Sequence, residues 1–179
     1  MKMLEKFKNP LIFVMVVLFL VNVTFFKYRV AFIIGESMEP THHNGEWVIA
    51  EKINNSKNSW TPDRFDVILV KDKSNENLSK RIIGLPRDTV EIKEGVIFLN
   101  EYPLDDPFGQ GKIGTYLVDE NGNRLKYWNG PEKGETIYKL TSISKITIPK
   151  GSVWVIGDNR EMSWYGILPI KNIKGLIIL

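Results

Sequence analysis

The stretch Ile34-Gly35-Glu36-Ser37-Met38-Glu39-Pro40 divides this chain of 179 residues into two parts of different character. An apolar run precedes the stretch, and a succession of short β-like segments follows it. Gly35 and Pro40 predict a turn around Ser37, because glycine permits unusual backbone angles and proline restricts the exit of a turn. Such a serine is either a nucleophile or an ordinary turn residue, and the turn alone favours the ordinary reading. Whether Ser37 is a nucleophile therefore depends on which side chains elsewhere in the chain could act with it.

Composition and charge exclude several classes of protein. A hydrophobic content of 43% and a charged content of 25% are typical of one globular domain with an appendage. The net charge of +3 comes from interspersed lysines and acids, so nucleic-acid binding is not expected. Cysteine is absent, which excludes thiol nucleophiles and thiolate metal sites. His42 and His43 are adjacent in one loop, a poor arrangement for a metal site.

Residues 10–26 carry no charge and predict a helix that anchors the protein in a membrane. The run is short, since about 20 residues typically span a bilayer. Three lysines and one glutamate within residues 1–9 favour an N-terminus on the cytoplasmic side. Lys27 and Arg29 follow the run and weaken that asymmetry.

Two alternatives to an uncleaved anchor are disfavoured. A cleaved signal peptide needs small residues before its cleavage site, and residues 23–27 contain none. A buried core helix is disfavoured because the run lacks a polar face. We therefore expect a cytoplasmic N-terminus at residues 1–9, a transmembrane helix at residues 10–28 and an extracytoplasmic body at residues 29–179.

The body is predicted to be mainly β, with antiparallel sheets, because short runs of β-forming residues alternate with turn residues. Residues 90–93 and 95–99 predict a hairpin that turns at Glu94 and Gly95. A less regular subdomain is expected around residues 100–145, where glycines and aromatic residues are frequent. The other expected strands are residues 46–50, 65–70, 80–86, 144–148, 153–156 and 175–179.

A base for Ser37 is hard to find among the histidines. His42 and His43 lie five and six residues after the serine, which leaves little room for the geometry of a triad. Lysine is the remaining common base, and it serves only when it is neutral, a state that apolar burial favours. Lys80 leads directly into an apolar segment and is the best candidate. The competing interpretation is a strand-edge lysine that prevents aggregation.

A third segment, Gly157-Asp158-Asn159-Arg160-Glu161-Met162-Ser163, follows an apolar run and has the composition of a turn. Arg160 can pair with an acid, and Ser163 can donate a hydrogen bond to a neutral amine. Alone, the segment is an ordinary turn.

Together these segments resemble the bacterial type I signal peptidases, membrane-anchored Ser-Lys endopeptidases that remove signal peptides from exported preproteins. The resemblance extends from the apolar run to about Gly175, and Phe65-Asp66-Val67 is similar to the family's Gly-Asp-Val strand. Four features follow the family's order: the anchor, Ser37-Met38-Glu39-Pro40-Thr41, Lys80-Arg81-Ile82-Ile83-Gly84-Leu85-Pro86 with Asp88, and Gly157-Asp158-Asn159-Arg160 with Ser163.

The resemblance implies that Ser37 is the nucleophile and Lys80 the general base, with no metal and no cofactor. Ser163 stands where the family has a serine that orients the lysine amine. Asp158 and Arg160 are implied to brace the site without reacting.

The chain departs from the family pattern at three places. The position two before the nucleophile is a serine in some members and supplies an oxyanion donor, but here it is Gly35, so the second donor beside the Ser37 N–H is unidentified. Ser163 is followed at once by Trp164, without the usual Asp-Ser-Arg segment. Arg87 replaces a usual glycine.

The resemblance also implies the partners: preprotein signal peptides with small residues at −3 and −1, and the lipid bilayer. Apolar surface including Met38 and Trp47 is expected to rest on that bilayer. Two alternatives are a noncatalytic assembly factor for surface proteins or pili and a self-cleaving repressor. The first need not keep both Ser37 and Lys80, and the second needs an N-terminal DNA-binding domain. The sequence therefore favours an active protease at the bacterial cell membrane.

Overall fold

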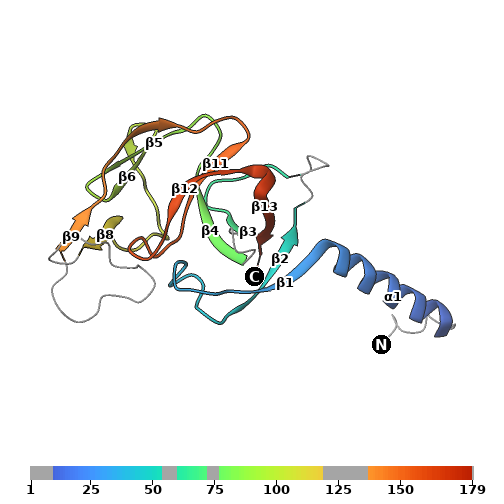
Figure 1. The fold of residues 1–179 in the computed structure, drawn as a ribbon. Coiled ribbons are helices and arrows are strands. Elements are labelled where there is room, and N and C mark those ends of the chain that lie inside the picture. The colour runs from blue at the N-terminus through green and yellow to red at the C-terminus, as the bar shows by residue number, and fades with distance from the viewer. Residues whose placement is uncertain (1–9, 54–59, 72–76, 119–136, 179) are drawn as a thin grey trace.

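The computed structural model describes residues 10–53, 60–71, 77–118 and 137–178 (Figure 1). A helix opens the described chain, short strands follow it, and a single turn of 3-10 helix (Ile170–Asn172) precedes the last strand. The elements are α1 (Pro10–Lys27), β1 (Tyr28–Phe32), β2 (Trp47–Lys52), β3 (Val67–Lys71), β4 (Asn77–Gly84), β5 (Thr89–Lys93), β6 (Val96–Leu99), β7 (Tyr102–Pro103), β8 (Gly114–Val118), β9 (Ile137–Leu140), β10 (Ile143–Thr147), β11 (Ser152–Ile156), β12 (Tyr165–Pro169) and β13 (Ile173–Ile177).

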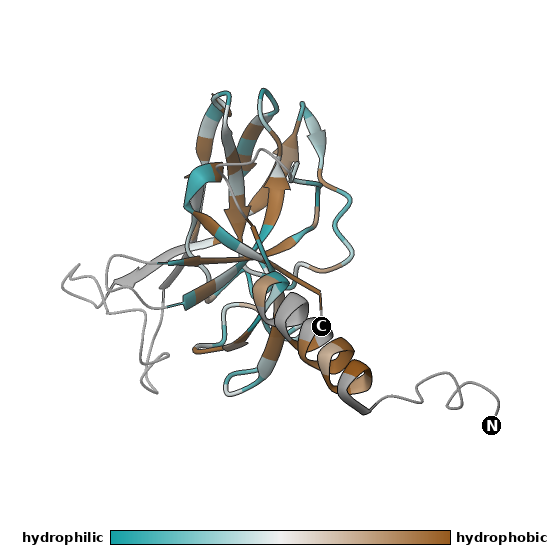
Figure 2. Ribbon diagram, turned by 90° about the vertical axis from the view of Figure 1, so that its right-hand side faces the viewer, coloured by the Kyte–Doolittle hydropathy of each residue, from teal (hydrophilic) through white to brown (hydrophobic). Residues whose placement is uncertain are grey.

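The helix α1 contains the whole uncharged run of residues 10–26 and projects from the β body (Figure 1). Hydrophobic residues recur along it, as the brown stretches of Figure 2 show. Within the described ranges, no helix has the combination of length and apolar character that crossing a membrane requires. The helix ends at Lys27, where the chain continues directly into β1.

The described strands form a largely antiparallel β structure, which confirms the predicted mainly β, antiparallel fold class. One sheet has the strand order β1-β2-β13-β3-β4-β11-β12, a second has the order β10-β5-β6-β7, and β8 pairs with β9. Neighbouring strands in these sheets run antiparallel, including those of the predicted hairpin of β5 and β6. That hairpin turns at Glu94 and Gly95, which both have positive φ angles, of 48° and 78°.

Some strands were not predicted from the sequence. The strand β1 begins at Tyr28, within the segment expected to be anchor, and β12 carries no recognisable alternation. Each pairs with the strand next to it in the sequence, β1 with β2 and β12 with β11. The less regular subdomain expected around residues 100–145 contributes β7 to β10, while residues 119–136 of it lie outside the described residues.

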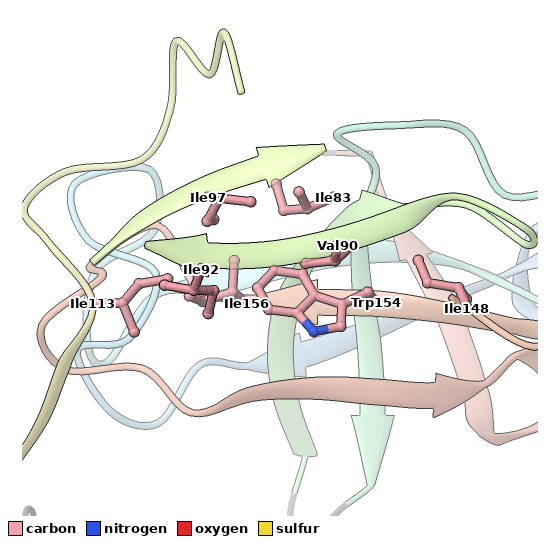
Figure 3. Close-up of a cluster of buried hydrophobic side chains, with 8 residues drawn as sticks. All are labelled: Ile83, Val90, Ile92, Ile97, Ile113, Ile148, Trp154 and Ile156. Atoms are coloured by element: carbon pink, nitrogen blue, oxygen red, sulfur yellow. The ribbon is translucent and has the colours of Figure 1, made fainter. Parts of the chain in front are cut away.

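The large sheet buries apolar side chains on both faces. On one face, Trp154 lies in a cluster between this sheet and the hairpin of β5 and β6 (Figure 3). Val153 and Val155 point to the other face and join a second cluster. The first cluster consists of Ile83, Val90, Ile92, Ile97, Ile113, Ile148, Trp154 and Ile156.

Strand β4 is central in this sheet, between β3 and β11, and carries two charged residues side by side. Successive residues of a strand point to opposite faces. Lys80 therefore lies on the face of β4 that holds Ile82, and Arg81 lies on the face that holds Ile83. Both charged side chains are buried, at 1% and 3% exposure. A buried charge is costly unless it is paired or neutralised, and the two residues meet this requirement differently.

Candidate active site

Ser37 lies half-buried in the loop that joins β1 to β2. Backbone hydrogen bonds from Ile33 to Glu46 and from Gly45 to Ile33 close the base of this loop. Met38, beside the serine, is fully buried and fixes the loop to the interior. The expectation that Met38 contributes apolar surface was therefore wrong, because its flexible side chain fills space under the loop.

The structure brings Lys80 to Ser37, although 43 residues separate them in the sequence. The Lys80 Nζ atom lies 2.6 Å from the Ser37 Oγ atom. It also donates to the carbonyl oxygen of Ser79, at 2.9 Å. A neutral amine has both N–H donors and a free electron pair, so at this distance it can accept the hydroxyl proton.

Burial lowers the pKa of Lys80 from 10.5 to about 8. The cause is desolvation, which disfavours the ammonium form. The carboxylate of Asp158 acts in the opposite direction, because its negative charge favours the ammonium, but desolvation is the larger effect. At pH 8 about half of the Lys80 amines are therefore neutral, compared with about 0.3% for an ordinary lysine.

Arg81 binds Asp158 through two nearly parallel hydrogen bonds. Its Nε and Nη2 atoms donate to the two carboxylate oxygens at 2.7 and 2.6 Å, and the paired side chains are 4% and 0% exposed. The Nη1 atom of Arg81 donates to the carbonyl oxygen of Phe65, at 2.7 Å. Thr41, from the nucleophile loop, donates to the Oδ2 atom of Asp158 at 2.5 Å. This network joins the loop of Ser37, strand β4 and the turn after β11.

Arg160 holds a neighbouring loop against the same turn. Its guanidinium forms an ion pair with Asp106, and both side chains are largely buried. The backbones are joined as well: the Arg160 N–H donates to the Gln110 carbonyl at 2.9 Å, and the Gln110 N–H donates to the Asp158 carbonyl at 2.8 Å. Gly109 leaves room for the guanidinium, since a Cβ atom there would lie 2.3 Å from it. Arg160 thus braces the turn without contacting Ser37 or Lys80 in the described structure.

The turn after β11 also packs against the backbone of the nucleophile. A Cβ atom on Gly157 would lie 2.0 Å from the Ser37 carbonyl oxygen, so a side chain is excluded there. The N–H of Asn159 donates to the same oxygen at 3.2 Å. These contacts fix the peptide group of Ser37 and thereby the direction of its side chain.

Ser163 is buried next to this turn, but its hydrogen bonds do not involve Lys80. Its Oγ atom accepts from the N–H of Gly157 at 2.6 Å and donates to the carbonyl oxygen of Trp164 at 2.8 Å. The ring of Trp164 instead faces the amine, with its centre 5.5 Å from Lys80 Nζ.

Gly35 has a φ angle of +94°, a conformation that favours glycine. Its N–H donates to the Oδ1 atom of Asn44 at 2.9 Å. In this arrangement the N–H of Gly35 is engaged and does not serve as a second oxyanion donor. Among the residues that the structure describes, no group of three or more His, Cys, Asp or Glu side chains is placed to bind a metal.

Four residues of the site received no role from the sequence. A signal existed for Arg81, because an arginine inside an apolar strand requires a buried acidic partner. Thr41, Asp106 and Trp164 gave no such signal, since their roles depend on contacts between distant loops.

A family model described as signal peptidase, peptidase S26, matches residues 5–179. The chain belongs to this family. Membership makes the protein a serine endopeptidase, and the Ser37 hydroxyl beside a buried amine is consistent with that class.

Individual relatives are similar over most of their length. Signal peptidase I V of Bacillus subtilis (strain 168) is 30% identical over 164 residues, which cover 87% of this chain and 85% of that protein. Signal peptidase I of Bacillus caldolyticus is 30% identical over 148 residues, 80% of this chain and 73% of that protein. A crystal structure of a signal peptidase I from Enterococcus faecalis V583 covers 66% of this chain and 98% of its own, with 22% identity and a TM-score of 0.39.

Proposed function

We propose that the protein is a membrane-bound endopeptidase that removes N-terminal signal peptides from exported preproteins, with Ser37 as nucleophile and Lys80 as general base. The observation that carries the proposal is the contact of 2.6 Å between Ser37 Oγ and the buried Lys80 Nζ. The named relatives are signal peptidases, which supports the substrate class. Substrates with small residues at −3 and −1 follow from the family resemblance.

The reaction starts when the neutral amine of Lys80 accepts the proton of Ser37 Oγ while this oxygen attacks the scissile carbonyl carbon. The C–N bond then breaks, the nitrogen of the leaving peptide takes the proton from the Lys80 ammonium, and the signal peptide remains as an ester on Ser37. Water attacks this ester, and Lys80 accepts the water proton and returns it to Ser37 Oγ. The N–H of Ser37 is the proposed first oxyanion donor.

Gly35, Ser163, Asp158 and Arg160 are proposed to support this site without reacting. Asp158 and Arg160 hold the turn whose Gly157 touches the backbone of Ser37. Gly35 lets the chain turn just before the nucleophile.

The test is cleavage of a purified preprotein with alanine at −3 and −1. We expect wild type to cut after −1, and Ser37→Ala and Lys80→Ala to lose at least 1,000-fold in kcat/KM, since catalytic groups of such a unit typically contribute about 10³-fold or more. Lys150→Ala, at an exposed turn, and His42→Ala are matched controls that should keep wild-type activity. Activity in Lys80→Ala would identify another base. A wild type that cuts none of several preproteins would favour the noncatalytic assembly factor.

We also propose that residues 10–28 anchor the protein in the cell membrane, with residues 1–9 cytoplasmic and residues 29–179 outside. The support comes from residues 10–26 of α1, which carry no charge, and from an apolar surface on the strands that follow the helix. On β1 and β2, Phe32 packs edge-on against Trp47 at 5.0 Å, and both rings are exposed. The exposed apolar residues of these two strands and of the loop between them are Val30, Phe32, Ile34, Trp47 and Ile49.

Carbonate extraction of cell membranes tests the anchor. Wild type should stay in the membrane pellet, and the double variant Val16→Arg/Val17→Arg should be released, because charges at a helix centre oppose insertion by about 2.5–3.5 kcal/mol each. Release of the wild type by carbonate would refute an integral anchor. Protease treatment of intact spheroplasts should digest the body, which reports its side of the membrane.

A further inference from the structure

We propose that Trp164 is a positioning residue that covers the amine of Lys80 and keeps water away from it. The inference deepens the proposed function and rests on the role of Lys80 as the base. In the family that this chain resembles, an Asp-Ser-Arg segment usually follows the serine at the position of Ser163. In this chain Trp164 follows Ser163 directly, and the proposal concerns this tryptophan.

The exposures of the two side chains indicate a cover. Lys80 is 1% exposed, whereas Trp164 is 42% exposed. The centre of the Trp164 ring lies 5.5 Å from Lys80 Nζ, and the ring is also partly exposed to solvent. The other contacts of Nζ are Ser37 Oγ at 2.6 Å and the carbonyl oxygen of Ser79 at 2.9 Å. Trp164 therefore lies at the boundary between the buried amine and water.

Ser163 holds this cover in place. Its hydroxyl connects the N–H of Gly157 to the carbonyl oxygen of Trp164, at 2.6 and 2.8 Å. Gly157 in turn touches the Ser37 carbonyl oxygen, so the backbone of Trp164 is fixed relative to the nucleophile. Ser163 thus acts on Lys80 through Trp164 and not by direct contact.

An aromatic ring near an amine has two opposing effects on its protonation. Its face attracts the ammonium, which favours the charged form. Its bulk excludes water, which favours the neutral form. The charged group that acts on Lys80 is Asp158, which favours the ammonium and is itself paired with Arg81. On the neighbouring strand β3, Ile68 faces Lys80 and carries no charge. The pKa of Lys80 is nevertheless lowered, so exclusion of water is the dominant effect around this amine.

The experiment is an NMR titration of the full chain in detergent, with lysine labelled with ¹³C at Cε. Loss of one signal in Lys80→Arg assigns Lys80. The variants are Trp164→Ala, which removes the cover, Trp164→Phe, which keeps a ring, and Ser163→Ala, which removes its support. Tyr102→Ala is the matched control, because Tyr102 is an exposed aromatic residue on the other sheet. The pH profile of kcat/KM is measured for the same set.

We expect Trp164→Ala to raise the pKa of Lys80 by about one unit or more, so that kcat/KM at pH 7 falls about tenfold and recovers above pH 10. Ser163→Ala should move the pKa in the same direction by less, while Trp164→Phe and Tyr102→Ala should leave it near the wild-type value. A Lys80 pKa in Trp164→Ala that is unchanged or lower would overturn the proposal. Trp164→Leu, which fills part of the same space without a ring, takes the place of the alanine variant if that variant unfolds, and the same rise of the pKa, of smaller size, is then required.

The titration also separates this inference from the proposed function. If Lys80→Ala remains active, the proposed base is wrong, yet the NMR pKa still decides whether Trp164 covers the amine. If Lys80→Ala is silent and Trp164→Ala leaves the pKa unchanged, the base stands and the cover is refuted.

Discussion

The buried amine of Lys80 should make the folded protein more stable as the pH rises from about 8 to about 10. The folded-state pKa of about 8 lies below the ordinary value of 10.5 that holds in the unfolded chain. Between these two values the unfolded chain binds more protons, so the free energy of unfolding increases with pH. Each pKa unit corresponds to about 1.36 kcal/mol, which makes the full effect about 3 kcal/mol. Between pH 7 and pH 10 the expected gain is about 2.5 kcal/mol.

The assay compares wild type with Lys80→Met by chemical denaturation at pH 7, 8, 9 and 10. Methionine has a similar length and no charge, so the difference between the two unfolding free energies isolates Lys80 from the other titrating groups. That difference should change by about 2.5 kcal/mol in favour of the wild type from pH 7 to pH 10. Lys150→Met, at an exposed turn, should show no such change. A constant difference for Lys80→Met would show that Lys80 keeps an ordinary pKa, and the argument for a neutral base near pH 8 would fail.

Three further predictions follow from the site. The pH profile of kcat/KM should rise with a midpoint near pH 8, because Lys80 must be neutral to accept the proton of Ser37, and a midpoint near 6.5 would instead indicate a histidine base. Arg81→Met should lower the unfolding free energy by about 3–5 kcal/mol, because it leaves the Asp158 carboxylate buried without its partner. The control Glu101→Gln, in an exposed ion pair, should leave the melting temperature unchanged. Equal stability of Arg81→Met and wild type would contradict a stabilising role of the Arg81–Asp158 pair. Gly157→Ala should reduce kcat/KM at least tenfold in the preprotein assay, because its Cβ atom would overlap the Ser37 carbonyl oxygen, and wild-type activity would show that the turn can move.

Local patterns in the sequence were sufficient for most strands of the body. The hairpin of β5 and β6 was predictable because its two strands are adjacent and its turn contains Gly95. The strand β12 was not, because Tyr165–Pro169 has no clear alternation and becomes a strand only by pairing with β11. Where a strand forms only because it pairs with another strand, the pattern of its own residues does not predict it.

The candidate site likewise contains some residues whose roles the sequence predicts and others whose roles it does not. Ser37 and Lys80 could be chosen from residue type and context, and the structure places their reactive atoms in contact. The partners of Ser163 could not be predicted, because they depend on how the turn at Gly157 meets the start of β12. A family resemblance supplied a role for Ser163 toward the amine, but this chain lacks the segment that follows the serine in the family. The structure places Trp164 beside Lys80, which sequence spacing alone does not reveal.

The register of β4 determines whether the base can exist at all. Lys80 and Arg81 are neighbours, so a shift of one residue would exchange the faces they occupy and put a permanently charged guanidinium beside Ser37. The buried pair of Arg81 and Asp158 opposes this shift, because it would move the guanidinium away from the Asp158 carboxylate and leave that carboxylate buried without its partner. On the two flanking strands, Lys80 pairs with Ile68 of β3, and Arg81 pairs with Ile156 of β11. The ion pair of Arg81 with Asp158 therefore also selects which of the two basic side chains reaches the nucleophile, and only the lysine can lose its proton there.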